Sequence, residues 1–183
     1  MNLKYRALIS VSVVCAGLAL FNLSGCAQTR VGTDAQSNPS PSPSPSPKLI
    51  TTSELAKLRW IEGTWRGTGG GVPPFYERYK FENDSTLLAE TLADETFAKV
   101  TEAGRFQLKD GHFGKTEGES GSVAIALDDN SITFAPLGKA RNYFRFQRES
   151  ENSWKAILNW TAKDGTAKEL TYLMERVSPA KPK

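Results

Sequence analysis

The fold of this chain is decided by the stretch Trp154-Lys155-Ala156-Ile157-Leu158-Asn159-Trp160-Thr161. Its even-numbered positions hold two tryptophans, an alanine and a leucine, and these alternate with lysine, isoleucine, asparagine and threonine. A period of two is the spacing of a β-strand, because successive side chains of a strand point to opposite faces of its sheet. The stretch therefore predicts a strand with one face inside and one face outside.

The same alternation recurs along much of the chain. Clusters of Asn, Asp, Gly and Ser separate these runs and are typical of tight turns. Short turns without crossover helices indicate antiparallel pairing. We therefore predict an all-β domain, an antiparallel up-and-down β-barrel of about 8–10 strands, with a two-sheet sandwich as the alternative. The runs are 75–81, 123–127, 132–134, 143–147 and 170–175, and the turns are 83–84, 109–111, 128–130, 150–152 and 163–165.

A short helix is predicted just before the first strand. Thr51 and Glu54 have the spacing of a capping box, in which each side chain satisfies a free backbone N–H at the start of a helix. Leu55, Leu58 and either Trp60 or Ile61 then follow at helical spacing. The helix should therefore turn one apolar face toward the barrel.

The first 25 residues have the layout of a bacterial secretory leader. Lys4 and Arg6 form a positive region, and Ala7–Leu20 form an apolar region that is shorter than the about 20 residues of a transmembrane helix. The following Leu23-Ser24-Gly25-Cys26 resembles the lipobox of bacterial lipoproteins. We expect residues 1–25 to be a lipoprotein signal peptide and Cys26 to carry fatty acyl chains. The alternatives are an uncleaved anchor and an ordinary signal peptide that is cut elsewhere.

Acylation at Cys26 would attach the chain to a membrane. Each buried methylene contributes about 0.8 kcal/mol, so two or more acyl chains, palmitate for example, hold a protein firmly. Ala27 stands where lipoproteins of the enterobacterial type carry an aspartate for inner-membrane retention. We therefore expect the cell envelope, and the outer rather than the inner membrane. The only other cysteine is Cys15 in the leader, so the mature domain has no thiol for a disulfide or a thiolate metal site.

Residues 26–48 differ in composition from the rest of the chain. Proline and serine alternate from Pro39 to Pro47, and almost no side chain in the segment is apolar enough to offset the entropy of folding. We expect a disordered linker in extended polyproline II geometry, and a docking motif and a glycosylated stalk are the alternatives. Residues 49–178 then form the barrel domain, and residues 179–183 a frayed tail.

Charge and composition exclude one class of partner. The formal net charge is +3, of which Lys4 and Arg6 in the leader contribute two, so the rest of the chain is nearly balanced. No run of basic residues is interleaved with aromatic residues. We therefore expect no nucleic-acid partner.

The start of the domain carries a resemblance to a known family. After the predicted helix the chain reads Trp60-Ile61-Glu62-Gly63-Thr64-Trp65-Arg66-Gly67-Thr68-Gly69, and Pro74-Phe75-Tyr76-Glu77 follows. This resembles the opening of calycin barrels, and is most similar to the nitrobindin-like and lipocalin-like bacterial domains. The last predicted strand, Glu169 to Val177, resembles the closing strand of that family. The resemblance spans residues 49–177, with motifs at the two ends, and implies the same barrel fold.

The resemblance implies structural roles for two residues, but the residue that binds the cofactor of the family is not present here. Trp65 would plug the closed end of the barrel beneath the helix, and Arg176 would lie across its ring by stacking and cation–π attraction. Nitrobindins hold haem through a histidine on the closing strand. The matching position here is Thr171. Haem binding is therefore not carried over, and we expect no cofactor.

No catalytic or metal-binding set is visible in the sequence. His112 is the only histidine, and a zinc site needs three or four ligands. Ser120 stands in a Gly-x-Ser-x-Gly match, but that motif needs a strand-to-helix turn. Acidic pairs such as Asp94-Glu95 fit solvated turns. We therefore predict no catalytic residue, no metal ligand and no enzyme activity.

These features lead to a hypothesis about function. Enclosed apolar surface with few polar groups is typical of small-molecule sites, so we expect the barrel to bind a small apolar or amphipathic ligand. One alternative is a packed, ligand-free barrel that serves as an envelope interaction or structural module, and a cavity of roughly 300 Å³ or more would separate the two. A third and weaker hypothesis is a hydrolase or isomerase, which would need a polar cluster around His112 or the carboxylates inside that cavity. The sequence does not indicate an oligomeric state. The residues expected to line the ligand are Tyr76, Phe134, Phe144, Phe146, Trp154, Trp160, Tyr172 and Met174.

Overall fold

The structure is a computed structural model that describes residues 46–115 and 120–178. The predicted signal peptide, Cys26, the linker up to residue 45 and the tail at 179–183 lie outside these residues. No helix in the described part of the chain is long and apolar enough to span a membrane.

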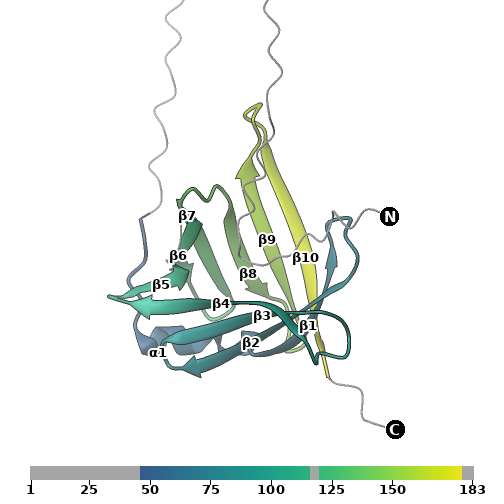
Figure 1. The fold of residues 1–183 in the computed structure, drawn as a ribbon. Coiled ribbons are helices and arrows are strands. Elements are labelled where there is room, and N and C mark those ends of the chain that lie inside the picture. The colour runs from purple at the N-terminus through teal and green to yellow at the C-terminus, as the bar shows by residue number, and fades with distance from the viewer. Residues whose placement is uncertain (1–45, 116–119, 179–183) are drawn as a thin grey trace, which may run out of the picture. The chain divides into compact units, whose positions relative to one another are not determined.

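Ten antiparallel strands form a closed barrel (Figure 1). Each strand pairs with the next one along the chain, and the first strand also pairs with the last. The predicted fold class is confirmed, and the sandwich is excluded because closure leaves no free sheet edge. The strands are β1 (Gly63–Gly69), β2 (Phe75–Asn83), β3 (Thr86–Leu92), β4 (Val100–Lys109), β5 (His112–Lys115), β6 (Ser120–Leu127), β7 (Ser131–Gly138), β8 (Tyr143–Arg148), β9 (Ser153–Thr161) and β10 (Ala167–Val177).

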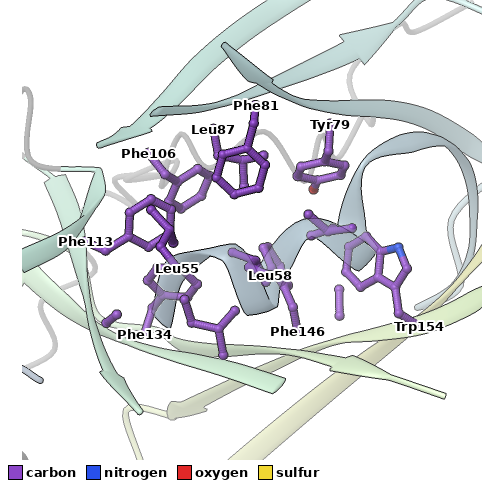
Figure 2. Packing of buried hydrophobic residues seen from close by; sticks show 14 of the residues in the cluster. Leu55, Leu58, Tyr79, Phe81, Leu87, Phe106, Phe113, Phe134, Phe146 and Trp154 are labelled. Atoms are coloured by element: carbon purple, nitrogen blue, oxygen red, sulfur yellow. The ribbon is translucent and has the colours of Figure 1, made fainter. Parts of the chain in front are cut away.

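The predicted helix is present as two short pieces, α1 (Thr52–Leu55) and η1 (Ala56–Ile61), the second of which is a 3₁₀ helix. The capping box forms: the Glu54 amide donates to Thr51 Oγ1 at 3.2 Å, and the Thr51 amide donates to Glu54 Oε2 at 2.9 Å. Leu55, Leu58 and Ile61 are completely buried. The helix thus covers one end of the barrel and presses its apolar face into the interior (Figure 2).

We call the part of the interior next to this helix the closed half, and it is filled with aromatic rings. The Phe106 ring lies 5.3 Å from that of Phe134 and 6.1 Å from that of Phe113, and Trp154 packs edge-on against Trp65 at 5.9 Å. Rings at these separations attract one another beyond the effect of burial alone. Figure 2 shows Phe106, Phe113, Phe134 and Trp154 gathered around the helix from different strands. The closed half is therefore the main hydrophobic core.

One seam of the barrel is reinforced by the segment before the helix. Among residues 112–115 and 120–127, the pairing of β5 with β6 joins Gly114 to Val123 and Lys115 to Ser122. Beside it, the Lys48 amide donates to Ala124 O at 2.9 Å, and the Ile50 amide donates to Gly111 O at 2.8 Å. Residues 48–50 thus add backbone hydrogen bonds to strand β6 and to the turn before β5.

Candidate functional site

The open half of the interior, which lies away from the helix, carries a band of polar side chains. Strand alternation places these residues on the inner face, one from each of five consecutive strands, β2 to β6. On β4, for example, the inner positions run from Phe106 in the core through Gly104 to Glu102. We call this band the polar wall, and its members are Glu77, Thr91, Glu102, Lys115 and Ser122.

Strand register sets the order of the polar wall. Glu77 is the cross-strand partner of Thr91, and Thr91 is the partner of Glu102, so these three side chains form a row across β2, β3 and β4. Lys115 is the partner of Ser122 in the same way across β5 and β6. Glu77 and Ser122 are each 3% exposed, while Glu102 and Lys115 are partly exposed. The wall is therefore buried at Glu77 and at Ser122, with solvent contact at Glu102 and Lys115.

Glu77 is the most unusual member of the polar wall. Its Oε2 accepts a hydrogen bond from the Tyr79 hydroxyl at 2.7 Å, and no other residue of the described chain bonds to its carboxyl group. Burial raises the pKa of Glu77 from its ordinary value of 4.5 to about 8, and the bond from Tyr79 only partly offsets this. Glu77 is thus mainly a neutral carboxylic acid at pH 7.

The opposite side of the open half is apolar. Inner-facing residues of β8, β9 and β10 lie across the ring from the polar wall, and we call them the apolar wall. Tyr172 packs edge-on against Phe75 at 5.4 Å. Burial raises the pKa of Tyr172, and the negative charge of ionised Glu77 raises it further. The Tyr172 ring therefore lies within electrostatic range of the Glu77 carboxyl group. The members of the apolar wall are Phe144, Leu158, Trp160, Leu170 and Tyr172.

A small pocket lies against the polar wall. It has a volume of about 20 Å³ and is bordered by Thr91, Glu102 and Lys115 together with Ala89, Ala103, Gly104 and Phe106. A Cβ atom at Gly104 would come within 3.3 Å of the Lys115 ammonium nitrogen, so the glycine leaves room for that side chain. About 10–15 Å³ is enough for one water molecule, so the pocket accepts a group of roughly that size.

Seven of the eight residues predicted to line a ligand lie on inner strand faces, but in different places. Phe146, Trp154 and Met174 are at most 2% exposed and belong to the packed core. Phe134 is also buried and stacks on Phe144 at 4.5 Å, where the core meets the apolar wall. The remaining members, Phe144, Trp160 and Tyr172, belong to the apolar wall.

Tyr76, the eighth residue, does not line the interior. It alternates with Glu77 along β2, and its ring lies 5.5 Å from that of Phe97 on the outer side of the strand. The period-two rule places Phe75, Glu77 and Tyr79 on the inner face, so Tyr76 belongs to the outer one. Tyr76 was predicted to line the interior because its side chain is aromatic, although its position in the alternation places it on the outer face.

Trp65 and Arg176 are cross-strand partners at the seam where β1 meets β10. The Arg176 guanidinium carbon lies 4.1 Å from the centre of a Trp65 ring. The Trp65 indole donates to Ile61 O at 2.7 Å, and Arg176 donates to Glu62 O at 2.7 Å and to Trp60 O at 3.2 Å. The pair therefore joins the helix to both closing strands and belongs to the closed half.

The described residues do not form a metal site. Within residues 46–115 and 120–178, no three His, Cys, Asp or Glu side chains gather closely enough to hold an ion. His112 begins β5 and is partly buried, and Ser120 begins β6 between two strands. Cys26, the predicted acylation site, lies outside the described residues.

The polar wall was missed by sequence reasoning, although one indication of it was present. The run from Phe75 to Phe81 places Glu77 among apolar neighbours on the inner face. A carboxyl in that position is costly to bury unless it has a partner. Thr91, Glu102 and Lys115 gave no comparable indication, because their strands lack a clear apolar alternation. Ser122 directly precedes the alternating run 123–127, which drew attention to the other face of its strand.

Comparison with known proteins finds similar solved structures at low sequence identity. No protein-family model matches the chain, and no curated protein matches it. One similar solved structure is a protein of unknown function from the DUF3598 family of Nostoc punctiforme, with 15% identity and a TM-score of 0.43 over 75% of this chain and 53% of that one. Another is a redesigned β-barrel, with 14% identity and a TM-score of 0.33 over 72% of this chain and 99% of that one. The chain thus spans about half the length of the first structure.

Proposed function

We propose that this chain is a lipid-anchored protein of the bacterial cell envelope whose barrel binds one small amphipathic molecule in its open half. The observation that carries the binding proposal is the division of that half into a polar wall and an apolar wall on opposite sides. An amphipathic molecule presents one polar and one apolar surface, so it matches both. Specific sites combine apolar lining with a few placed polar groups in this way.

The buried polar groups favour binding over a purely structural interior. A carboxyl without a charged partner destabilises a core, and Glu77 is such a group. The Ser122 hydroxyl is also buried, and no described residue hydrogen-bonds to it. The polar end of a ligand would supply a further partner to whichever of these two side chains it reaches.

The membrane attachment rests on the leader and on Cys26. The lipobox resemblance predicts acylation there, and the proline-rich segment would hold the barrel away from the lipid. Cell fractionation tests this step: the full chain should be recovered with membranes, and Cys26→Ser should move it to the soluble fraction. Recovery of both proteins in the same fraction would contradict acylation at Cys26.

The binding step is tested by native mass spectrometry of the full chain purified from its own organism. A retained small molecule is expected in the wild-type protein. Ala89→Leu should fill the pocket beside the polar wall and abolish retention. Ala126→Leu, at an exposed position of β6, is the matched control and should retain the molecule. A wild-type protein without any bound molecule would contradict the proposal.

A second function is favoured by the packing of the closed half. The core rings are at contact distance, and the pocket is about 20 Å³, which is far smaller than the roughly 300 Å³ of an ordinary ligand site. A rigid, ligand-free barrel would serve as an interaction module on the envelope. Crosslinking in cells that yields a defined protein partner, together with an empty barrel by mass spectrometry, would favour this function.

A further inference from the structure

The environment of Glu77 indicates which chemical group the open half recognises. The carboxyl is 3% exposed, and Tyr79 is the one described residue that bonds to it. Its neighbour on β2, Arg78, faces outward and pairs with Glu90 at 2.6 Å. No described lysine or arginine forms an ion pair with Glu77. A buried carboxylate is normally paired, so Glu77 in its ionised form needs a cation that no described residue supplies.

Aromatic rings around Glu77 provide a second and independent indication. Phe75 and Tyr79 flank it on the inner face of β2, and Tyr172 lies edge-on against Phe75 at 5.4 Å. The Phe75 ring occupies the place where a Cβ on Gly67 would be, so it lies close against the β1 backbone. Aromatic faces attract cations, and ring clusters are a known means of binding ammonium groups.

The size of the neighbouring pocket agrees with a small polar group such as ammonium. The pocket borders Thr91, the cross-strand partner of Glu77, and its volume of about 20 Å³ suits a group as small as water or ammonium. Two carboxyl groups, Glu77 and Glu102, lie in the row on either side of Thr91. The pocket is also bordered by Lys115, whose positive charge would favour an anionic ligand. The experiment below tests that possibility.

We propose that the open half recognises a protonated aliphatic amine, whose ammonium group pairs with the Glu77 carboxylate beside Thr91 and whose chain lies along the apolar wall. This inference rests on the proposed function and names the ligand class for it. No covalent bond to the ligand forms or breaks. The Glu77 carboxyl releases its own proton to solvent, and the ammonium keeps its protons and donates to the carboxylate.

The proton released is a measurable signature of this pairing. Because the pKa of Glu77 is about 8, roughly 0.9 proton should leave for each amine bound at pH 7. The other ionisable groups near this site are Tyr79 on β2, Tyr172 and Arg176 on β10, Glu102 on β4 and Lys115 on β5. A neutral ligand of the same length has no ammonium to pair with and should release no proton.

Isothermal titration of the full chain in lipid nanodiscs would test the proposal. The probes are n-hexylamine, n-hexanol and n-hexanoate, with titrations into empty nanodiscs subtracted. The amine should bind at least tenfold more tightly than the other two. Measurements in two buffers with different ionisation enthalpies should show the proton release for the amine alone. Amine affinity should also rise about fifty-fold from pH 6 to pH 8, as Glu77 ionises.

Glu77→Gln keeps an acceptor for the Tyr79 hydroxyl and removes the charge. It should weaken hexylamine binding at least tenfold and abolish the proton release, while hexanol binding stays within threefold. Glu90→Gln, on the outer face of β3, is the matched control and should bind the amine like the wild type. If Glu77→Gln does not fold, the pH dependence of the wild type decides alone.

The possible failures are distinguishable. If hexanol or hexanoate binds as tightly as the amine, or if amine affinity does not change with pH, the amine proposal is overturned and the proposed function stands. If hexanoate binds most tightly of the three, the pocket recognises an anion through Lys115 and not an ammonium group through Glu77. If none of the three probes binds, both the amine proposal and amphipathic binding fail.

Discussion

The closed half and the open half of this barrel are built by the same ten strands but meet different demands. The closed half is filled by rings such as Phe106 and Trp154 and by the helix, and its buried surface stabilises the fold. The open half places Glu77, Ser122 and a small pocket on the corresponding inner faces. The open half therefore contributes less to the stability of the fold than the closed half does, which is expected of a binding site.

The largest expected effect is the pH dependence that Glu77 gives to stability. Its folded pKa of about 8 exceeds the ordinary value of 4.5, so between these values the folded protein holds a proton that the unfolded chain has released. The free energy of unfolding should therefore fall as pH rises from 4.5 to 8, by up to about 5 kcal/mol, and then level off. Urea unfolding at a series of pH values measures this.

Glu77→Gln is the control for that prediction, because it removes the titration and keeps the shape. The decline between pH 5 and pH 8 should disappear in the variant. Carboxylates such as Asp128, whose pKa is lowered by the Asn130 amide and the Ser131 hydroxyl, lose stabilising effect only at more acidic pH. A wild-type stability that is flat or rises from pH 5 to pH 8 would show that Glu77 is not held neutral.

The next largest effect compares one ring from each half. Phe106→Ala should lower the free energy of unfolding by about 4 kcal/mol, because Phe106 is 1% exposed and contacts three other phenylalanines. Phe144→Ala, in the partly exposed apolar wall, should cost about half as much. Chemical denaturation of both variants gives the ratio. Equal costs would mean that the two halves are packed alike.

A smaller effect is expected where the closed half is sealed. Arg176→Ala removes the cation–π contact with Trp65 and the hydrogen bonds to Trp60 O and Glu62 O, and should cost about 2 kcal/mol. Arg66→Ala is the control, because its ion pair with Glu175 is 3.9 Å long and lies at the surface. That substitution should cost less than about 0.5 kcal/mol. If the two variants lose the same unfolding free energy, the contacts of Arg176 have no special role in joining β1 to β10.

Sequence reasoning succeeded in the closed half for a physical reason. The strands that border it alternate apolar and polar residues, as in Trp154 to Thr161, and all five predicted turns lie between consecutive strands. The capping box at Thr51 formed as predicted. Patterns of this kind depend only on residues that are close together in the chain, so they can be recognised in a single sequence.

The same reasoning failed at the polar wall of the open half, because the inner positions there are themselves polar or small. β3 and β4 were not singled out as alternating runs, and their inner positions include Ala89, Thr91, Glu102 and Gly104. When the inner face of a strand is not apolar, apolar and polar residues do not alternate along it, so the period of two cannot be recognised in the sequence. The row from Glu77 to Glu102 also depends on register across three strands, which no single strand encodes. The failure thus falls on the candidate site.

The smallest effect tests how far the helix contributes to the contrast between the halves. Thr51→Ala removes the hydroxyl that accepts from the Glu54 amide at 3.2 Å, and should cost about 1 kcal/mol of unfolding free energy. Thr51→Ser keeps the acceptor and should cost little. Because the helix packs only into the closed half, the alanine variant should leave hexylamine binding unchanged. A loss of binding that accompanies this loss of stability would mean that the two halves unfold and bind as one unit, and that the division between them has no energetic basis.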